Sequence, residues 1–228
     1  MSAARDTYSA VIFDMDGVLV DSEPAFFDAV NQVLSADGRS IEFGRYQVLL
    51  GTSVEETWRG LIAMLGLRGD LDDYLRRYND VLLARLRQPR PPLPGVVELL
   101  DELERRRVPV ALATSSWRAW ADAVLEGADL QRRFQAIATA ADVEREKPAP
   151  DLYLKAAELL ARPPERCIAI EDTPSGVAAA RAAGMYVIQV RAASTAFPPI
   201  EAADLVLESL EDFPLVLVAA QDEREAGR

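Results

Sequence analysis

The sequence predicts an α/β fold in which a doubly wound parallel sheet is interrupted by an inserted all-helical domain. Three observations lead to this prediction. Short continuous apolar runs recur along the chain and end at polar residues, as expected for strands buried on both faces of a parallel sheet. Amphipathic helical patterns lie between most of these runs, and one long stretch after the first run contains helical patterns only.

The predicted strands are the apolar runs themselves. The first run stops abruptly at Asp14, the second stops at Thr114, and a later one stops at Glu171 and Asp172. Strands that alternate with helices form a Rossmann-like, doubly wound core. In chain order, the six predicted strands cover residues 10–13, 108–113, 136–138, 167–170, 186–190 and 205–207.

Helical patterns connect these strands. An apolar stripe runs through residues 96–103, and a second helix is expected over 151–160, before Pro163. A third, alanine-rich helix is expected over 175–183 and ends at Gly184, a residue typical of helix C-termini.

The stretch from about residue 23 to 88 differs, because it contains helical patterns alone. Ser53 and Glu56 have the spacing of a capping box, and Asp70 precedes a helical run from 71 to about 87. A proline-rich connector then ends the helical pattern. We therefore predict an α/β domain over 1–21 and 92–228 and an inserted helical domain over 22–91.

Composition excludes several classes of function. The formal net charge is −12, which argues against nucleic acid and against an anionic membrane surface as partners. No apolar run is long enough to predict a transmembrane helix, and no secretory signal is visible, so we expect a cytoplasmic protein. The chain contains no histidine and one cysteine, Cys167, in an apolar run. Histidine-based catalysis and an internal disulfide are therefore excluded, and Cys167 is expected to be a buried thiol.

Polar residues follow several of the predicted strands, at the edge where ligands bind in open α/β sheets. Taken alone, Thr114 could cap a helix, Lys147 could be a solvated lysine and the acidic pair could begin a helix. Their joint placement instead predicts one pocket that contains Asp14, Asp16, Thr114, Lys147, Glu171 and Asp172.

Four acids in one pocket would repel one another strongly without a cation. Mg²⁺ prefers oxygen ligands and would offset this repulsion, while Lys147 and Thr114 supply a positive charge and a hydroxyl donor. These groups suit a phosphate, and a carboxylate can act as a nucleophile that forms an aspartyl-phosphate. Gly17 permits a tight turn beside the acids.

The ordered motifs resemble those of the haloacid dehalogenase-like superfamily of phosphohydrolases, in the branch of β-phosphoglucomutases and phosphoglycolate phosphatases with a helical cap. The resemblance spans nearly the whole chain, and the insertion is similar to the family's cap domain. The motifs are Asp14-Met15-Asp16-Gly17-Val18, Thr114-Ser115-Ser116, Lys147-Pro148-Ala149-Pro150-Asp151 and Glu171-Asp172-Thr173-Pro174-Ser175-Gly176.

This resemblance implies roles for individual residues. Asp14 would be the nucleophile and Asp16 the general acid and base. Mg²⁺ would be held by Asp14, by the backbone carbonyl of Asp16 and by Asp172, with Glu171 acting through water. Thr114, Lys147 and the backbone of Ser115 would hold the phosphoryl oxygens.

The resemblance also implies the function, a Mg²⁺-dependent phosphatase acting on a small phosphorylated metabolite. Gly51 and Thr52 lie in a segment similar to the substrate-specificity loop of the cap. A sugar-phosphate mutase is the nearest alternative, which the lack of histidine disfavours. From another class, a receiver-like phospho-switch without turnover remains open, although the helical insertion argues against it. The protein is expected to be a monomer or a homodimer.

Overall fold

The computed structural model describes residues 7–49, 53–193 and 197–218. Contacts within the chain divide it into two compact units. Met1–Asp21 and Pro89–Arg228 form the first, the α/β unit, and Ser22–Gln88 form the second, the helical unit. Among the described residues, no helix combines the length and the apolar character needed to cross a membrane.

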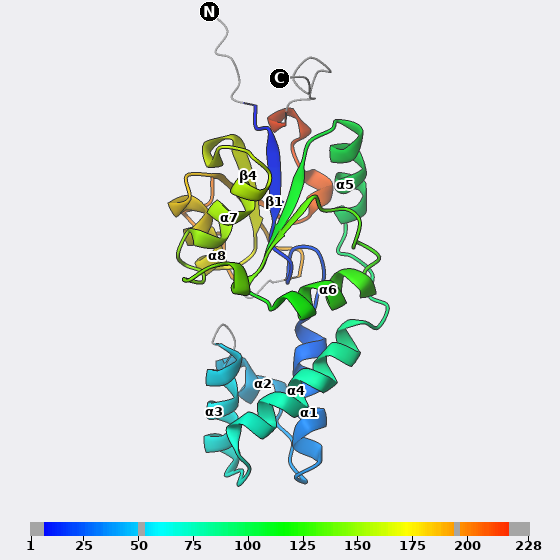
Figure 1. Ribbon diagram of the computed structural model, residues 1–228, viewed down its shortest axis with the longest axis vertical. Helices are drawn as coiled ribbons and strands as arrows, with labels where there is room; N and C mark the ends of the chain where they lie inside the picture. The colour runs from blue at the N-terminus through cyan, green and yellow to red at the C-terminus, as the bar shows by residue number, and fades with distance from the viewer. Residues whose placement is uncertain (1–6, 50–52, 194–196, 219–228) are drawn as a thin grey trace, which may run out of the picture. The chain divides into compact units, whose positions relative to one another are not determined.

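A six-stranded parallel sheet forms the centre of the α/β unit (Figure 1). Its strand order is β3-β2-β1-β4-β5-β6, so the order reverses between β1 and β4. The predicted doubly wound α/β class is therefore confirmed. The strands are β1 (Ala10–Phe13), β2 (Val110–Ala113), β3 (Ala136–Ala138), β4 (Cys167–Glu171), β5 (Tyr186–Val190) and β6 (Leu205–Leu207).

Helices cover both faces of this sheet, and Figure 1 shows α7 and α8 on one side and α5 on the other. The main helices are α5 (Val96–Arg105), α6 (Arg118–Gly127), α7 (Asp151–Leu159) and α8 (Pro174–Ala182). Short 3₁₀ turns lie at Ala140–Asp142, Pro164–Arg166, Leu210–Asp212 and Leu215–Leu217.

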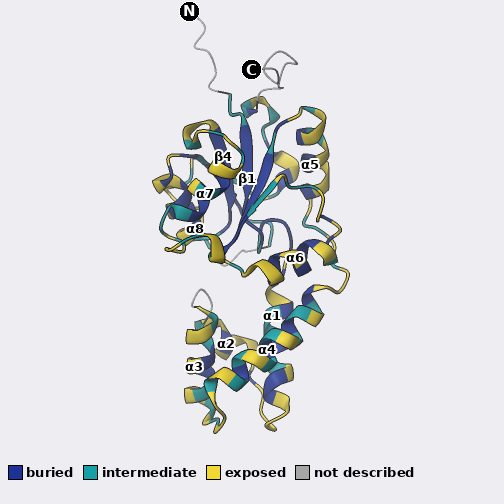
Figure 2. Cartoon of the chain, viewed as in Figure 1, coloured by how far each residue is buried: buried dark blue, intermediate teal, exposed yellow. Residues whose placement is uncertain are grey.

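Small residues line the sheet face that α7 and α8 cover. Because side chains alternate along a strand, alanines such as Ala10, Ala111 and Ala169 share this face. They form one buried cluster with α7 residues that include Leu152 and Tyr153. Small strand residues allow close helix packing, and this brings Tyr153 to the end of β4. Figure 2 shows the central strands of the sheet as buried, and β1, β2 and β4 are buried along their whole length.

The second strand begins later than predicted. It starts at Val110 rather than at residue 108, because Val108 belongs to the turn that ends α5. Arg107 has a φ of 58°, and the amide of Val108 donates to the carbonyl of Leu103 at 2.8 Å. This pattern is a Schellman-type helix end, which an apolar run conceals. Cys167 is a buried thiol as predicted, and burial raises its pKa to about 11.

The described elements of the helical unit are all helices. Trp58 stacks on Tyr74 with ring centroids 5.3 Å apart, which joins α3 to α4 in the core of this unit. The capping box is confirmed, since Ser53 accepts from the amide of Glu56 and Glu56 accepts from the amide of Ser53. The elements are α1 (Glu23–Ser35), α2 (Phe43–Tyr46), a 3₁₀ turn (Gln47–Leu49), α3 (Val54–Leu65) and α4 (Leu71–Leu86).

Candidate active site

The candidate active site lies at the carboxyl end of the sheet, where the strand order reverses between β1 and β4. Phe13 pairs with Ile170, and the amide of Asp14 donates to the carbonyl of Ile170 at 2.9 Å. This register places Asp14, just after β1, level with Glu171 at the end of β4. The crevice at such a reversal point is the usual ligand site of open α/β sheets.

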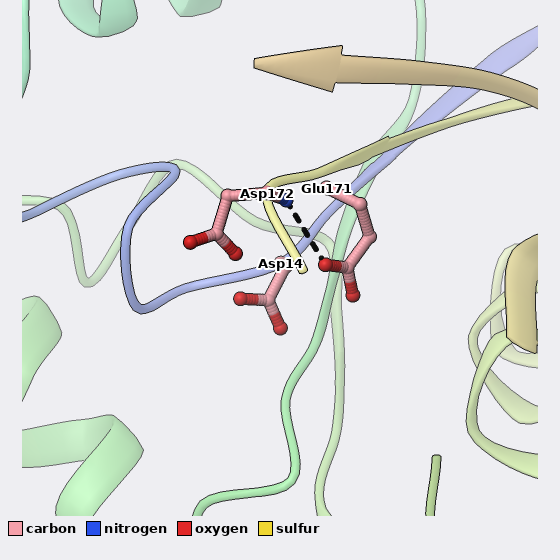
Figure 3. Close-up of side chains that lie close together, drawn as sticks. All are labelled: Asp14, Glu171 and Asp172. Carbon is pink, nitrogen blue, oxygen red and sulfur yellow. Dashed lines mark hydrogen bonds between the residues drawn. The ribbon is translucent and has the colours of Figure 1, made fainter. Parts of the chain in front are cut away.

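Three carboxylates converge at this point (Figure 3). Asp14, Glu171 and Asp172 are buried, and each offers an oxygen that lies within 4.8 Å of the others. The first comes from the loop after β1, and the other two come from the end of β4. Buried acids need compensation, because removing ionised carboxylates from water is costly.

Lys147 provides part of that compensation. Its Nζ lies 2.5 Å from Asp14 Oδ1 and 2.5 Å from Glu171 Oε1, and it donates to the carbonyl of Ala113 at 3.1 Å. Its side chain is buried and is therefore not the solvated lysine of the alternative interpretation. Burial lowers the pKa of Lys147, but the charges of Asp14 and Glu171 outweigh this effect and raise it.

Glu171 is held from several directions. Its Oε1 accepts from Lys147 and from the Tyr153 hydroxyl at 2.8 Å, and its Oε2 accepts from the amides of Asp172 at 3.0 Å and Thr173 at 3.3 Å. Thr173 is the N-cap of α8 and accepts from the amide of Gly176. A Cβ at Gly176 would overlap the Glu171 carboxylate, so only glycine leaves room for it there.

Asp172 is less fully satisfied. Its Oδ1 is buried and has no hydrogen-bond partner among the described residues. A Cβ at Gly17, whose φ is 81°, would overlap the Asp172 carboxylate. Glycine at position 17 therefore permits both the turn and the close approach of this acid.

The pKa values of the Asp14 and Asp172 carboxyls are raised. Burial raises the pKa of Asp14 from 3.8 to about 8, against the attraction of Lys147 and with repulsion from Glu171 and Asp16. Burial, Asp14 and Glu171 raise the pKa of Asp172 from 3.8 to about 9. One lysine is thus too little positive charge for these acids, and burial disfavours the ionised forms of both carboxyls.

These features fit a divalent cation. The donors are carboxylate oxygens, which Mg²⁺ prefers, and the buried Asp172 Oδ1 faces no protein donor in the described part of the chain. A bound cation would also reverse the pKa shifts, because its charge favours ionised carboxylates. The predicted metal residues Asp14, Glu171 and Asp172 are therefore brought together. The Asp16 side chain is not part of this group.

Asp16 instead contacts the loop after β2. Ser116 Oγ donates to Asp16 Oδ2 at 3.2 Å, and the amide of Ser116 donates to Thr114 Oγ1 at 3.1 Å. The hydroxyl of Thr114 therefore organises its own loop, and α6 begins only at Arg118, with Trp117 at the N-cap position. The alternative of Thr114 as the helix cap is wrong.

The remaining predicted substrate-binding residues are Ser115, Gly51 and Thr52. Ser115 lies on the exposed part of the loop after β2, next to Thr114. Gly51 and Thr52 lie outside the described residues, so the predicted specificity loop stays a prediction.

The sequence placed Ser116 in the second motif without a role, and it did not indicate Tyr153 as part of the site. The available signals were a second serine after Thr114 and a tyrosine on the apolar face of the helix that follows Lys147. A buried tyrosine usually finds a partner for its hydroxyl.

Comparisons with known proteins agree with this geometry. The model of the haloacid dehalogenase-like hydrolase family matches residues 11–190. Fructose-1-phosphate phosphatase YqaB of Escherichia coli is 34% identical over 189 residues, which cover 82% of this chain and 98% of that protein. Beta-phosphoglucomutase of Bacillus subtilis is 32% identical over 219 residues, covering 92% of this chain and 93% of that protein.

A longer relative and a solved structure extend the comparison. Protein SUPPRESSOR OF QUENCHING 1, chloroplastic, of Arabidopsis thaliana is 36% identical over 80% of this chain, and the match spans 18% of that protein's length. The crystal structure of CbbY from Rhodobacter sphaeroides in complex with phosphate has a TM-score of 0.80 and 27% identity, covering 90% of this chain and 96% of that chain. With its parallel sheet, its buried acids and a family match over most of its length, this chain belongs to the haloacid dehalogenase-like hydrolase family.

Proposed function

We propose that the chain is a Mg²⁺-dependent phosphatase that hydrolyses a small phosphorylated metabolite through an aspartyl-phosphate on Asp14. The observation that carries the proposal is the buried contact between Asp14 and Lys147, beside an Asp172 oxygen that lacks a partner among the described residues. Family membership supports the same enzyme class, a phosphoric monoester hydrolase.

In the proposed reaction, a carboxylate oxygen of Asp14 attacks phosphorus while the bond between phosphorus and the ester oxygen breaks. Asp16 gives its proton to the leaving oxygen, and Ser116 holds the carboxyl of Asp16 in position. Asp16 then takes a proton from water, whose oxygen attacks the phosphorus of the aspartyl-phosphate. Inorganic phosphate leaves, and the Asp14 carboxylate is restored.

The other residues bind and position the phosphoryl group. We assign its oxygens to Lys147, Thr114 and the backbone of Ser115. Mg²⁺ would be held by Asp14, Asp172 and the backbone carbonyl of Asp16, with Glu171 acting through water. When bound, it would supply positive charge that offsets charge on the transferring phosphoryl group.

We further propose that the helical unit is a cap that selects the substrate, with Gly51 and Thr52 in its specificity loop. The connectors support this role, because both leave the α/β unit side by side just after the Asp14 loop. Within the α/β unit, Arg90 Nη1 donates to the carbonyl of Asp21 at 3.1 Å, and the amide of Leu93 donates to the carbonyl of Leu19 at 2.8 Å. We also propose that the cap closes when substrate binds. Small-angle scattering that shows no change on adding substrate would contradict this closure.

Phosphate release from a panel of esters tests the activity. The panel contains sugar phosphates first, because relatives carry sugar-phosphate names, followed by phosphoglycolate and nucleotides. We expect sustained release with Mg²⁺ and none with Asp14→Asn or with EDTA. A folded wild-type protein that releases no phosphate from any ester would contradict the phosphatase.

The same samples distinguish the alternatives. A mutase, which similarity to a phosphoglucomutase favours, would isomerise a hexose phosphate without net phosphate release. A phospho-switch would label Asp14 once and stop. We also propose that the enzyme is cytoplasmic, which cell fractionation can test. We propose that it is a monomer or a homodimer, and sedimentation distinguishes the two.

A further inference from the structure

Tyr153 is a buried tyrosine whose hydroxyl reaches into the candidate active site. It lies on α7 and has no exposed surface, and its hydroxyl donates to Glu171 Oε1 at 2.8 Å. Its ring lies beneath the ammonium of Lys147, with Nζ 5.1 Å from the ring centroid. The Tyr153 side chain therefore contacts both Lys147 and Glu171, and Lys147 in turn joins Glu171 to Asp14.

Lys147 has no spare donor in this arrangement. An ammonium carries three N–H groups, and Asp14, Glu171 and the Ala113 carbonyl accept all three. To bind a phosphoryl oxygen, Lys147 must release one of these acceptors. Asp14 is needed as the nucleophile, and Ala113 lies in the backbone of β2, so Glu171 is the acceptor that Lys147 releases.

Release of Lys147 would leave Glu171 Oε1 buried with one donor among the described residues, the Tyr153 hydroxyl. Without that donor, the carboxylate oxygen would be unsatisfied, which costs free energy and favours rotation of the side chain. Rotation would also disturb Oε2, which fixes the amide of Asp172 at the start of the loop before α8.

We propose that Tyr153 is a positioning residue for this reaction, which holds Glu171 in place while Lys147 moves from Glu171 to the phosphoryl group. The inference rests on the proposed phosphatase function. Through Glu171, Tyr153 also keeps Asp172 directed at the metal position. In this role Tyr153 would act through Glu171 and would touch neither the phosphoryl group nor the metal.

Tyr153→Phe removes the hydroxyl and keeps the ring. The matched control is Tyr74→Phe in the helical unit, because Tyr74 is also buried and donates to a carboxylate, Asp37 Oδ2, at 2.9 Å. We expect Tyr153→Phe to lower kcat about tenfold and to change KM for the ester less than about twofold. Tyr74→Phe should leave both constants within about twofold of the wild type.

A second measurement does not depend on turnover. Titration calorimetry with Mg²⁺ alone should show a Kd about tenfold higher for Tyr153→Phe and an unchanged Kd for Tyr74→Phe. Wild-type values of both kcat and the Mg²⁺ Kd in Tyr153→Phe would overturn the inference, whatever the melting temperature. If the wild type releases no phosphate, the proposed function fails, but the calorimetric comparison still tests Tyr153.

A double-mutant cycle tests the route of the effect. If Tyr153 acts through Glu171, adding Tyr153→Phe to Glu171→Ala should raise the Mg²⁺ Kd further by less than about twofold, because that background lacks the carboxylate that accepts from Tyr153. An independent tenfold increase in that background would overturn the proposed route.

Discussion

In the α/β unit, Lys147 pairs with Asp14, 133 residues away, and both side chains are almost fully buried. In the helical unit, Arg59 pairs with Glu55 one turn away, and both side chains are more than half exposed. An exposed helical pair contributes little to stability, whereas a buried pair must offset the loss of hydration. The Lys147–Asp14 pair therefore lies where charges are costly, whereas the Arg59–Glu55 pair contributes little to stability.

The largest expected difference between the two units is in the effect of replacing the basic residue of each pair, Lys147 or Arg59, on activity and on the free energy of unfolding. Lys147→Met leaves Asp14 and Glu171 without their shared partner, so we expect kcat to fall about 10³-fold. In EDTA, the free energy of unfolding should fall by about 3 kcal/mol. Arg59→Met should lower it by less than about 1 kcal/mol. Urea unfolding and phosphate release measure these effects, and equal losses of stability in both variants would contradict the comparison.

A smaller difference should appear as opposite responses to pH. In EDTA, Asp14 and Asp172 have folded pKa values of about 8 and about 9, raised from 3.8. The folded state therefore holds protons that the unfolded state has lost, and stability falls as pH rises from about 5 to 9. We expect the free energy of unfolding to fall steadily, by several kcal/mol, over this range.

Glu56 of the helical unit should respond with the opposite sign. Hydrogen bonds from Ser53 lower the pKa of Glu56, so its stabilising effect is present above the ordinary glutamate pKa and is lost as pH falls below it. Chemical unfolding across pH measures both trends. Asp172→Asn should flatten the loss at high pH and leave the acid side unchanged. A curve for Asp172→Asn parallel to that of the wild type would contradict the assignment.

The sequence and the structure agree best where a local pattern is sufficient. Apolar runs predict the strands, and Ser53 with Glu56 predicts a helix start, because burial and capping each depend on near neighbours. The predicted strand start at Val108 is wrong, because Arg107, whose backbone has a left-handed conformation, ends a helix just before it. Tyr153 was missed because its partner Glu171 is 18 residues away, and only the packing of α7 on the alanine face brings the two together.

The smallest expected effect concerns two glycines that occupy helices of the different units. A Cβ at Gly176 of α8 would overlap the Glu171 carboxylate, while a Cβ at Gly44 of α2 meets nothing within 4 Å. We expect Gly176→Ala to lower the free energy of unfolding by about 2 kcal/mol, because Glu171 must leave its donors. Gly44→Ala should change it by less than about 1 kcal/mol, toward greater stability.

Thermal and urea unfolding of the two alanine variants measure this difference, and the Glu171→Ala background identifies its cause. If the carboxylate is what excludes a side chain at position 176, Gly176→Ala should cost almost nothing once that carboxylate is gone. A cost that persists in Glu171→Ala would instead place the strain in the backbone of α8. A cost no greater than that of Gly44→Ala would mean that Glu171 has room to move, and the site would then be less tightly built than the hydrogen bonds to Glu171 indicate.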